Sequence, residues 1–279
     1  MSGQRITDQT IAGRPTAKFR AQRALMRFGE KVPKGGERRI YDARPWYHDF
    51  SRFGVMTNFG QHASLGEKAI NAVRSIVGKP PVGQHANQAV KDEQIIPYLQ
   101  RAFALHVAEY GPVGELLDLF SADGYYSFLG VRELGAQHAT AVDLRSYYLE
   151  QGRLVAGVLN EERVSFVQGD VYELDDSPAD VCLCAGGLYH VTDPELLLKN
   201  LRAKANVLVT QSIVTTHTDD PTFFVSPAPG LPHGCRFTHG YFEAMLKRTG
   251  WQIVEGRFDM VGGPINAYSK GSSTFICKR

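Results

Sequence analysis

The chain has 279 residues, of which 43% are hydrophobic and 22% charged, and its formal net charge at pH 7 is +2. This is the composition of an ordinary globular protein, and no segment approaches the ~20 apolar residues that a membrane span needs. Domains usually hold roughly 100–200 residues, so we expect one large domain, alone or with an appendage. The small net charge points to no particular partner.

The charge is unevenly distributed along the chain. Residues 1–39 carry ten Lys or Arg and three acids, a net +7, which leaves −5 for residues 40–279. A basic N-terminal arm can contact an anionic partner such as RNA or a phosphorylated metabolite. The alternative is a solvated leader with no such role, because chain termini are often loosely ordered.

Four cysteines are present, and their spacing suggests neither a zinc site nor a disulfide scaffold. Cys182 and Cys184 alternate within an apolar run and should point to one face of a strand. The N-terminus has neither the apolar stretch of a signal peptide nor a myristoylation start. We therefore expect a cytoplasmic protein without a bound metal, present as a monomer or homodimer.

Residues 1–109 are rich in Arg, Gln and His and show no strand pattern, which predicts an N-terminal helical cap segment. Helices are expected at Ala17–Phe28 and Leu65–Val77, followed by a Pro-Gly break at residues 79–83. Apolar residues at helical spacing predict a third helix over Asp92–Tyr110. Pro97 would then lie in its first turns, where proline is tolerated best.

Residues 110–279 alternate between short apolar runs and amphipathic segments. Such alternation indicates βαβ units and a parallel sheet covered on both faces. We expect a Rossmann-like, doubly wound α/β domain with a seven-stranded, mainly parallel sheet whose last strand is antiparallel. The expected strands are 115–120, 138–144, 164–168, 179–185, 206–213, 251–258 and 273–278. Ligands of such sheets bind at the carboxyl ends of the strands.

The first expected strand leads into a tight turn, Phe120-Ser-Ala-Asp-Gly124. Gly124 and the small Ala122 allow a ligand to approach the backbone, and the following helix offers free N–H groups and a positive dipole. Asp118 places an acid near the end of the strand. One glycine in such a turn is a common feature, so this motif alone is weak.

Asp143 ends the second expected strand, nineteen residues after Gly124. An acid at this position of a Rossmann-like fold binds ribose hydroxyls, because one carboxylate accepts hydrogen bonds from both hydroxyls of a diol. The alternative is an N-cap for the helix that follows. We favour the ribose interpretation because the turn and the acid occur together.

Two further segments follow the third and fourth strands. Asp170 with Val171 can serve an adenine, the acid accepting from the amino group and a backbone N–H serving a ring nitrogen. The alternative is an ordinary loop aspartate. The segment after the fourth strand, Ala185-Gly-Gly-Leu-Tyr-His190, places small residues, an aromatic residue and a histidine at the carboxyl end of the central sheet.

These segments together resemble the class I S-adenosylmethionine-dependent methyltransferase superfamily. Within it, the chain is most similar to the tRNA wobble-uridine carboxymethyltransferase group and its small-molecule relatives. The similarity covers residues 45–279, and Leu188-Tyr-His190 is its most specific part. Pro45-Trp46, Phe50-Ser-Arg-Phe-Gly54 and Lys91-Asp-Glu-Gln-Ile-Ile-Pro-Tyr-Leu99 resemble segments that precede the core in that group.

The resemblance implies S-adenosylmethionine as cofactor and S-adenosylhomocysteine as product. It implies that the turn frames the methionine part, that Asp143 binds the ribose and that Asp170 and Val171 bind the adenine. Lys91 and Tyr189 match positions that contact a carboxylate on the modified cofactor of the carboxymethyltransferases. The full set of expected cofactor-binding residues is Asp118, Phe120, Ala122, Gly124, Asp143, Leu144, Asp170, Val171 and Ala185.

The chain also departs from the superfamily pattern. The usual turn is Gly-x-Gly-x-Gly, and Phe120 and Ala122 stand where its first two glycines would be. Phe120 requires a turn that holds a large side chain near the cofactor. The substitutions raise the alternative of a cofactor-binding subunit without catalysis. Recognisable tRNA-specific extensions are missing, which argues against a transfer RNA substrate.

Methyl transfer to oxygen usually needs a base, and histidine suits this because its pKa lies near working pH. His190 follows the fourth strand, so His190 and its neighbour Tyr189 are the candidate catalytic residues, although a structural role for His190 is the alternative. The Pro-Gly-rich segment 227–239 is long enough for a lid or substrate loop. Candidate substrate-binding residues are Trp46, Tyr47, His48, Lys91, His233 and Arg236.

We therefore expect a methyltransferase that acts on a small molecule, with oxygen of a metabolite, sugar or natural product as the acceptor. An RNA-modifying methyl- or carboxymethyltransferase is the first alternative, supported by the resemblance and the basic arm. A non-catalytic cofactor-binding subunit is the second. A dehydrogenase is disfavoured because Gly-x-Gly-x-x-Gly is missing.

Overall fold

The computed structural model describes residues 37–57, 72–73, 86–174, 177–260 and 270–279. The helices expected at Ala17–Phe28 and Leu65–Val77 lie outside these residues, apart from positions 72–73, and so does the basic arm up to residue 36. None of the described helices is long and apolar enough to cross a membrane.

The centre of the structure is a seven-stranded sheet in the order β3-β2-β1-β4-β5-β9-β8. Strands β1 to β5 run parallel to their neighbours, whereas β9 is antiparallel to both β5 and β8. The prediction of seven strands with the last one antiparallel is thus confirmed. The strands are β1 Glu115–Leu119, β2 His138–Asp143, β3 Val164–Gln168, β4 Ala179–Ala185, β5 Ala205–Val214, β8 Gln252–Met260 and β9 Gly271–Lys278.

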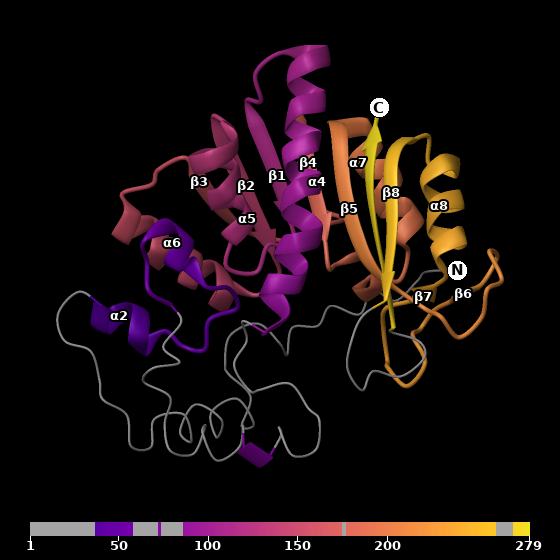
Figure 1. Ribbon diagram of the computed structural model, residues 1–279, viewed down its shortest axis with the longest axis horizontal. Coiled ribbons are helices and arrows are strands. Elements are labelled where there is room, and N and C mark those ends of the chain that lie inside the picture. Colours follow the sequence, from indigo (N-terminus) through magenta and orange to yellow (C-terminus); the bar gives the residue numbers. More distant parts are fainter. Residues whose placement is uncertain (1–36, 58–71, 74–85, 175–176, 261–269) are drawn as a thin grey trace.

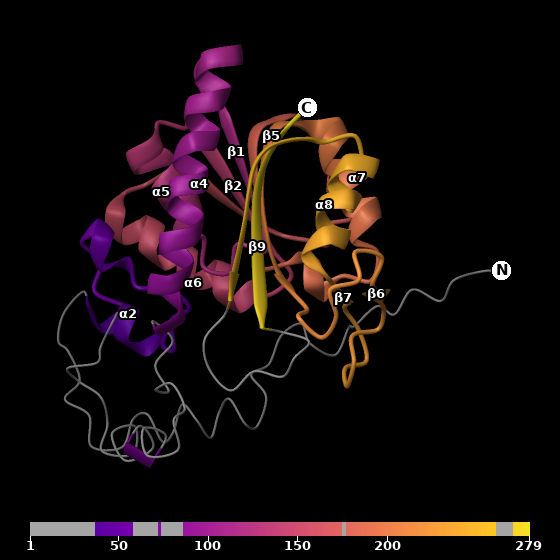
Figure 2. The ribbon, with the colours of Figure 1, turned by 45° about the vertical axis from the view of Figure 1, so that its right-hand side comes forward.

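Helices cover both faces of the sheet (Figures 1 and 2). One apolar core joins the sheet to α4 (Ala86–Tyr110), α5 (Tyr125–Leu129) and α6 (Ser146–Leu159). The other joins it to α7 (Pro194–Lys204) and α8 (His239–Arg248). The central strands β1, β4 and β5 are buried on both faces, which explains their continuous apolar runs. Cys182 and Cys184 share the second core, as their spacing predicted.

Helix α4 begins at Ala86, six residues before the predicted start, so Pro97 is its twelfth residue and not a first-turn residue. The prediction for Pro97 was wrong because Gln88 and its neighbours extend the helix on the N-terminal side. In the interior of a helix, proline removes one hydrogen bond to the preceding turn. Packing of Ile95, Leu99 and Phe103 in the first core holds the helix in place at this position.

The N-terminal residues that the structure describes pack on the same core. They form α2 (Glu37–Asp42) and the 3-10 turn η1 (Phe50–Phe53), which lie near α6 and the lower edge of the sheet in Figure 1. Ile40, Trp46 and Phe50 are buried together with residues of α4 and the sheet. The division between a cap and a core domain at residue 109 stays a prediction.

The segment between β5 and α8 contains a small two-stranded sheet, β6 (Phe224–Val225) paired with β7 (Arg236–Phe237). The segment therefore returns on itself, and β7 ends directly before Thr238. Thr238 caps α8, since its side chain accepts a hydrogen bond from the backbone N–H of Tyr241. This arrangement brings β7 to the loop that follows β4.

Candidate functional site

The turn after β1 has an unusual backbone. Phe120, Ala122 and Gly124 all have positive φ angles, of 56°, 49° and 75°. The left-handed conformation costs L-residues other than glycine roughly 1–2 kcal/mol each, and it is rarest for bulky side chains. The turn therefore keeps a glycine-type conformation at three alternating positions although only one of them is glycine. Such strain concentrates at functional sites.

The Phe120 side chain lies against the loop after β4. A Cβ atom added to Gly187 would come within 1.8 Å of Cδ2 of the Phe120 ring, a distance that no packing tolerates. Gly187 is thus the position that makes room for Phe120. A large side chain at position 120 needs a turn with room for it, and that room is provided by Gly187, 67 positions further along the chain.

Asp118 lies in β1 beneath the turn and is 2% exposed. Its Oδ2 accepts a hydrogen bond of 2.7 Å from the Ser127 hydroxyl. Burial raises the pKa of Asp118 to about 7, the hydrogen bonds from Ser127 oppose this, and the charges of Asp143 and Asp123 raise the pKa further. The turn therefore gathers three carboxyl groups that repel one another and favour a cationic ligand.

Asp143 ends β2 beside the same turn. Its Oδ2 accepts from the backbone N–H of Ala122 at 3.0 Å and its Oδ1 from that of Arg145 at 2.9 Å. The N-cap of α6 is Arg145, not Asp143. A carboxylate offers about four acceptor positions, so two remain for a diol. Burial raises the pKa of Asp143, while these two backbone hydrogen bonds lower it.

The residues expected at the adenine end lie beyond β2 and β3, which are neighbours in the sheet. Leu144 is 61% exposed and presents an apolar surface next to Asp143. Asp170 is exposed and accepts from the backbone N–H of Tyr172 at 3.0 Å, whereas Val171 is buried in the second core. Leu144 and Asp170 are thus available to a ligand, and the Val171 side chain contributes to packing.

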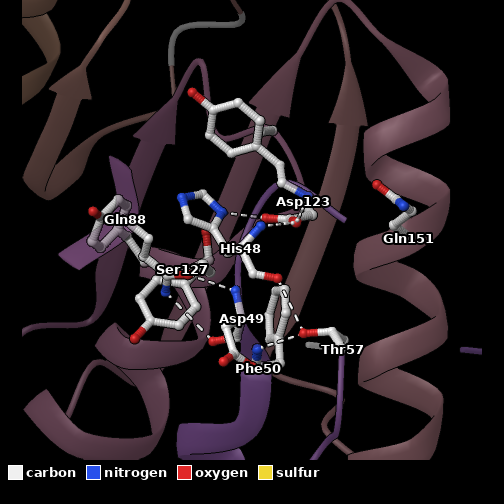
Figure 3. Close-up of polar contacts among 12 residues, drawn as sticks. His48, Asp49, Phe50, Thr57, Gln88, Asp123, Ser127 and Gln151 are labelled. Atoms are coloured by element: carbon white, nitrogen blue, oxygen red, sulfur yellow. Dashed lines mark hydrogen bonds and ion pairs between the residues drawn. The ribbon is translucent and has the colours of Figure 1, made fainter. Parts of the chain in front are cut away.

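Asp123, which the sequence analysis quoted only as part of a motif, fastens the N-terminal segment to the turn (Figure 3). It is fully buried, and its Oδ2 accepts from the backbone N–H groups of Tyr47 at 3.2 Å and His48 at 2.9 Å. Its Oδ1 pairs with Nδ1 of the His48 ring. The His48 ring also stacks on Tyr125, with ring centroids 5.0 Å apart. Its Nε2 is buried without a hydrogen-bond partner among the described residues.

Tyr47 and Lys91 meet beside the loop after β4. Lys91 Nζ donates to the Tyr47 hydroxyl at 2.8 Å and lies 3.8 Å from where a Cβ of Gly186 would be. Tyr47 also packs edge-to-face on Tyr148 of α6, with ring centroids 5.6 Å apart. Trp46, in contrast, is 2% exposed and donates its indole N–H to the Ile40 carbonyl. Trp46 therefore belongs to the core.

Tyr189 and His190 form the 3-10 turn η4 (Leu188–His190), and their ring centroids are 4.1 Å apart. β7 packs on this turn. The Cys235 N–H donates to the Tyr189 carbonyl at 3.1 Å, and the Arg236 guanidinium carbon lies 5.4 Å from the centroid of the Tyr189 ring. A Cβ on Gly234 would come within 2.6 Å of the Tyr189 carbonyl, so the two loops are closely fitted.

The electrostatics of η4 distinguish its two side chains. The pKa of His190 is lowered to about 4, first by desolvation and then by electrostatic interaction with Arg236, Arg145, His233 and Lys91. Its imidazole is therefore neutral at working pH and able to accept a proton. Burial raises the pKa of Tyr189 to about 12, so its hydroxyl remains protonated. Of the two, His190 is the candidate base.

The structure thus brings most candidate residues together in two groups: an acidic group at the β1 turn and a cationic-aromatic group at η4. Arg145 and Gly187 join them, although neither was among the candidate site residues. Arg145 follows the ribose acid by two positions, and Gly187 belongs to the motif after the fourth strand, but nothing in the sequence indicated its contact with Phe120. Within the part of the chain that the structure describes, no group of His, Cys, Asp and Glu is arranged to hold a metal ion.

Comparison with known families gives a partial match. Residues 121–205 match a family described as "Methyltransferase domain", which is less than half of the chain. The matched segment begins directly after Phe120. No curated protein matches the chain.

Solved structures resemble the chain in fold. The N-terminal domain of EvdMO1 with S-adenosylhomocysteine bound aligns over 87% of this chain and 94% of that domain, with 18% identity and a TM-score of 0.57. The same domain in the presence of S-adenosylhomocysteine and D-fucose gives a TM-score of 0.56 at the same identity and coverage. The [4+2]-cyclase SpnF aligns over 64% of this chain and 81% of that chain, with 14% identity and a TM-score of 0.50. At these identities the likeness shows the fold alone.

Proposed function

We propose that this chain is a class I S-adenosylmethionine-dependent methyltransferase that transfers the cofactor's methyl group to an oxygen atom of a small molecule, a proposal supported by the methyltransferase-domain match over residues 121–205 and by the fold. The observation that carries the proposal is the Asp143 carboxylate. It is oriented by backbone N–H groups from the β1 turn and from the start of α6, with acceptor positions left for a ribose diol. The finer roles below rest on this arrangement.

The residues at the β1 turn fit S-adenosylmethionine in charge and in shape. The cofactor carries positive charge on its sulfonium and ammonium groups, and Asp118, Asp123 and Asp143 lie around the turn. Left-handed backbone at three positions keeps the turn tight in the manner of the usual glycines. We assign the ribose to Asp143, the adenine to Leu144 and Asp170, and the methionine part to the turn. The cofactor supplies the activated methyl group.

The chain's own task is to align the acceptor and to take its proton. His190 follows β4, is neutral above a pH of about 5 and lies beside Tyr189. We assign the acceptor proton to the His190 ring. Tyr189 keeps its proton and donates a hydrogen bond to the acceptor. Lys91, Tyr47 and Arg236 border this position from α4, the N-terminal segment and β7.

A small-molecule acceptor is favoured by the closeness of the N-terminal segment to the site. Asp123 binds the backbone of Tyr47 and His48, and the Tyr47 hydroxyl accepts from Lys91, which lies beside Gly186 of the loop after β4. Among similar folds, the EvdMO1 domain was solved in the presence of a sugar. A fold match alone does not fix chemistry, since SpnF, named as a cyclase, shares the architecture.

The test is transfer of labelled methyl from S-adenosylmethionine into host extract separated into total RNA and small molecules. We expect label in the small-molecule fraction and calorimetric binding of S-adenosylhomocysteine. Label in RNA would replace the small-molecule acceptor by an RNA substrate, with turnover that falls steeply as salt rises.

One observation favours a second candidate, a cofactor-binding protein that transfers nothing. Phe120 occupies a glycine position of the turn, and its ring lies on Gly187. Binding of S-adenosylhomocysteine without labelling of either fraction would support this candidate. Restored labelling in a Phe120→Gly variant would identify the ring as the obstacle.

A further inference from the structure

Arg236 is a buried guanidinium without an acidic partner. Its side chain belongs to β7 and is only 8% exposed. Its hydrogen bonds run from Nη1 to two backbone carbonyls, those of Cys235 at 2.6 Å and Tyr189 at 3.3 Å. No carboxylate of the described residues lies within ion-pair distance of it. Buried charges in proteins are normally paired, because desolvation of an unpaired charge is strongly unfavourable.

Other cations converge on the same position from separate elements. Lys91 of α4 donates to the Tyr47 hydroxyl. Arg145, at the N-cap of α6, lies 5.8 Å from the Tyr148 ring and interacts with Asp143. After desolvation, electrostatic interaction with these groups and with His233 and Arg236 lowers the pKa of His190. Lys91 and Arg236 border η4, and neither has an acid of the described chain to balance it.

We propose that the acceptor carries an anionic group, a carboxylate or a phosphate, and that Arg236 and Lys91 bind this group beside Tyr189. The inference rests on the proposed methyl transfer and names the class of its substrate. A guanidinium binds either oxyanion through paired N–H donors, and an ammonium adds a point charge that adapts to the ligand. Lys91 lies beside Gly186 and Arg236 beside Tyr189, so the two cations border the same loop and define an orientation for the acceptor.

Binding of such an anion has a chemical consequence for His190. Desolvation is the first cause of the low pKa of His190, and the charges of neighbouring groups, among them Arg236 and Lys91, lower it further in the free protein. An anion beside Arg236 and Lys91 offsets their charge and raises the pKa of His190 toward its ordinary value. The ring then becomes a stronger base when the acceptor is in place, and it remains a weak one when the acceptor is missing.

The anion has two possible sources, and the test separates them. The cofactor has its own carboxylate at the methionine end, so the probe is inorganic phosphate titrated into protein with and without saturating S-adenosylhomocysteine. The readout is the NMR signal of the His190 ring, followed as a function of pH. We expect phosphate to bind the cofactor complex and to raise the pKa of His190.

Substitutions test whether Arg236 and Lys91 bind the phosphate. Arg236→Gln and Lys91→Gln should each weaken phosphate binding about ten- to hundredfold, the effect of losing a charge-assisted hydrogen bond. Arg248→Gln, on the outer surface of α8, is the matched control and should change nothing. Lys91 is only partly buried, so Lys91→Gln tests the idea even if Arg236→Gln fails to fold, and Arg236→Lys should retain part of the binding.

Three outcomes would overturn the proposal. The first is wild-type protein whose His190 signal does not respond to phosphate. The second is equal phosphate affinity in wild type and both Gln variants. The third is phosphate binding that saturating S-adenosylhomocysteine abolishes, because the cations would then serve the cofactor's carboxylate. Failure of S-adenosylhomocysteine to bind would instead refute the proposed function, independently of the phosphate result.

Discussion

The loops after β1 and after β4 lie side by side at the carboxyl ends of the parallel strands, and their side chains carry opposite charge. The β1 turn gathers Asp118, Asp123 and Asp143, where burial and then the charges of the other two carboxyl groups raise the pKa of Asp118. The β4 loop is bordered by Lys91 and Arg236, and desolvation followed by positive charges such as theirs lowers the pKa of His190. The carboxyl ends of two neighbouring strands thus offer an acidic site for a cationic cofactor and a cationic site for a different ligand.

The two loops also differ in where their glycines lie. The β1 turn is left-handed at Phe120 and Ala122, where glycine would be unstrained. The β4 loop has glycine at Gly186 and Gly187, and the Phe120 ring lies on Gly187. The room that a glycine would have provided in the first loop is therefore provided by the second. Four substitutions test this division of charge and space.

His190→Ala should have the largest effect on turnover. Loss of a general base costs at least about a hundredfold in kcat. Affinity for S-adenosylhomocysteine should stay within about twofold, because the ring borders the cationic and not the acidic loop. Methyl transfer with the natural acceptor and calorimetry with S-adenosylhomocysteine measure the two effects. Wild-type turnover in the variant would move the base role to another residue.

Asp143→Ala should weaken binding of S-adenosylhomocysteine by roughly ten- to hundredfold, since two hydrogen bonds to a charged acceptor are lost. Asp143→Asn should lose less, because the amide keeps one oxygen acceptor. Calorimetry provides the measurement. Unchanged affinity in the alanine variant would remove the ribose assignment and leave Asp143 as a structural partner of Ala122 and Arg145.

Gly187→Ala should destabilise the protein by about 1–3 kcal/mol, the usual cost of overpacking, because the added methyl group meets the Phe120 ring. Combining it with Phe120→Gly should recover most of that loss, which a double-mutant cycle in urea would measure. Gly157→Ala is the matched control, because a Cβ there meets nothing within 4 Å. Additive effects of the two changes would mean that the loops do not share this space.

Asp118→Asn should have the smallest effect, a change in how stability depends on pH. The pKa of Asp118 is raised to about 7 in the folded protein, above its ordinary value near 4. The folded state therefore holds a proton that the unfolded state has lost, and this stabilisation disappears as the pH rises from about 4 through 7. Melting temperatures at pH 5 and pH 8 should differ less in the variant than in wild type, with exposed Asp219→Asn as the control. Equal pH dependence in all three proteins would contradict the prediction.

Much of the fold was predictable because its determinants are local. Apolar runs located all seven strands of the main sheet. The start of α4 was missed because the apolar spacing used to predict this helix begins only at Ile95, and the β6–β7 pair was missed because it spans only two residues in each strand. Short pairs of this kind are held by their surroundings more than by their own sequence.

The candidate site was predictable only in part. The ribose role of Asp143 was predicted from spacing and stays a prediction, and the structure places the carboxylate beside the β1 turn. The burial of Arg236 and the contact of Phe120 with Gly187 depend on loops far apart in the sequence, and no local pattern carries that information. Asp123 was visible as a motif residue, but its partners, Tyr47 and His48, precede it by 75 or 76 positions.

The Asp123 carboxylate has a thermodynamic consequence. Asp123 is a buried residue of the β1 turn, and its carboxylate accepts from the backbone of Tyr47 and His48, so the stability of the turn is coupled to that of the N-terminal segment. A ligand that stabilises the turn must then stabilise the N-terminal segment, and by reciprocity any molecule gripped by that segment must tighten cofactor binding by the same factor. Through this one side chain, either ligand would strengthen binding of the other, whichever of the two binds first.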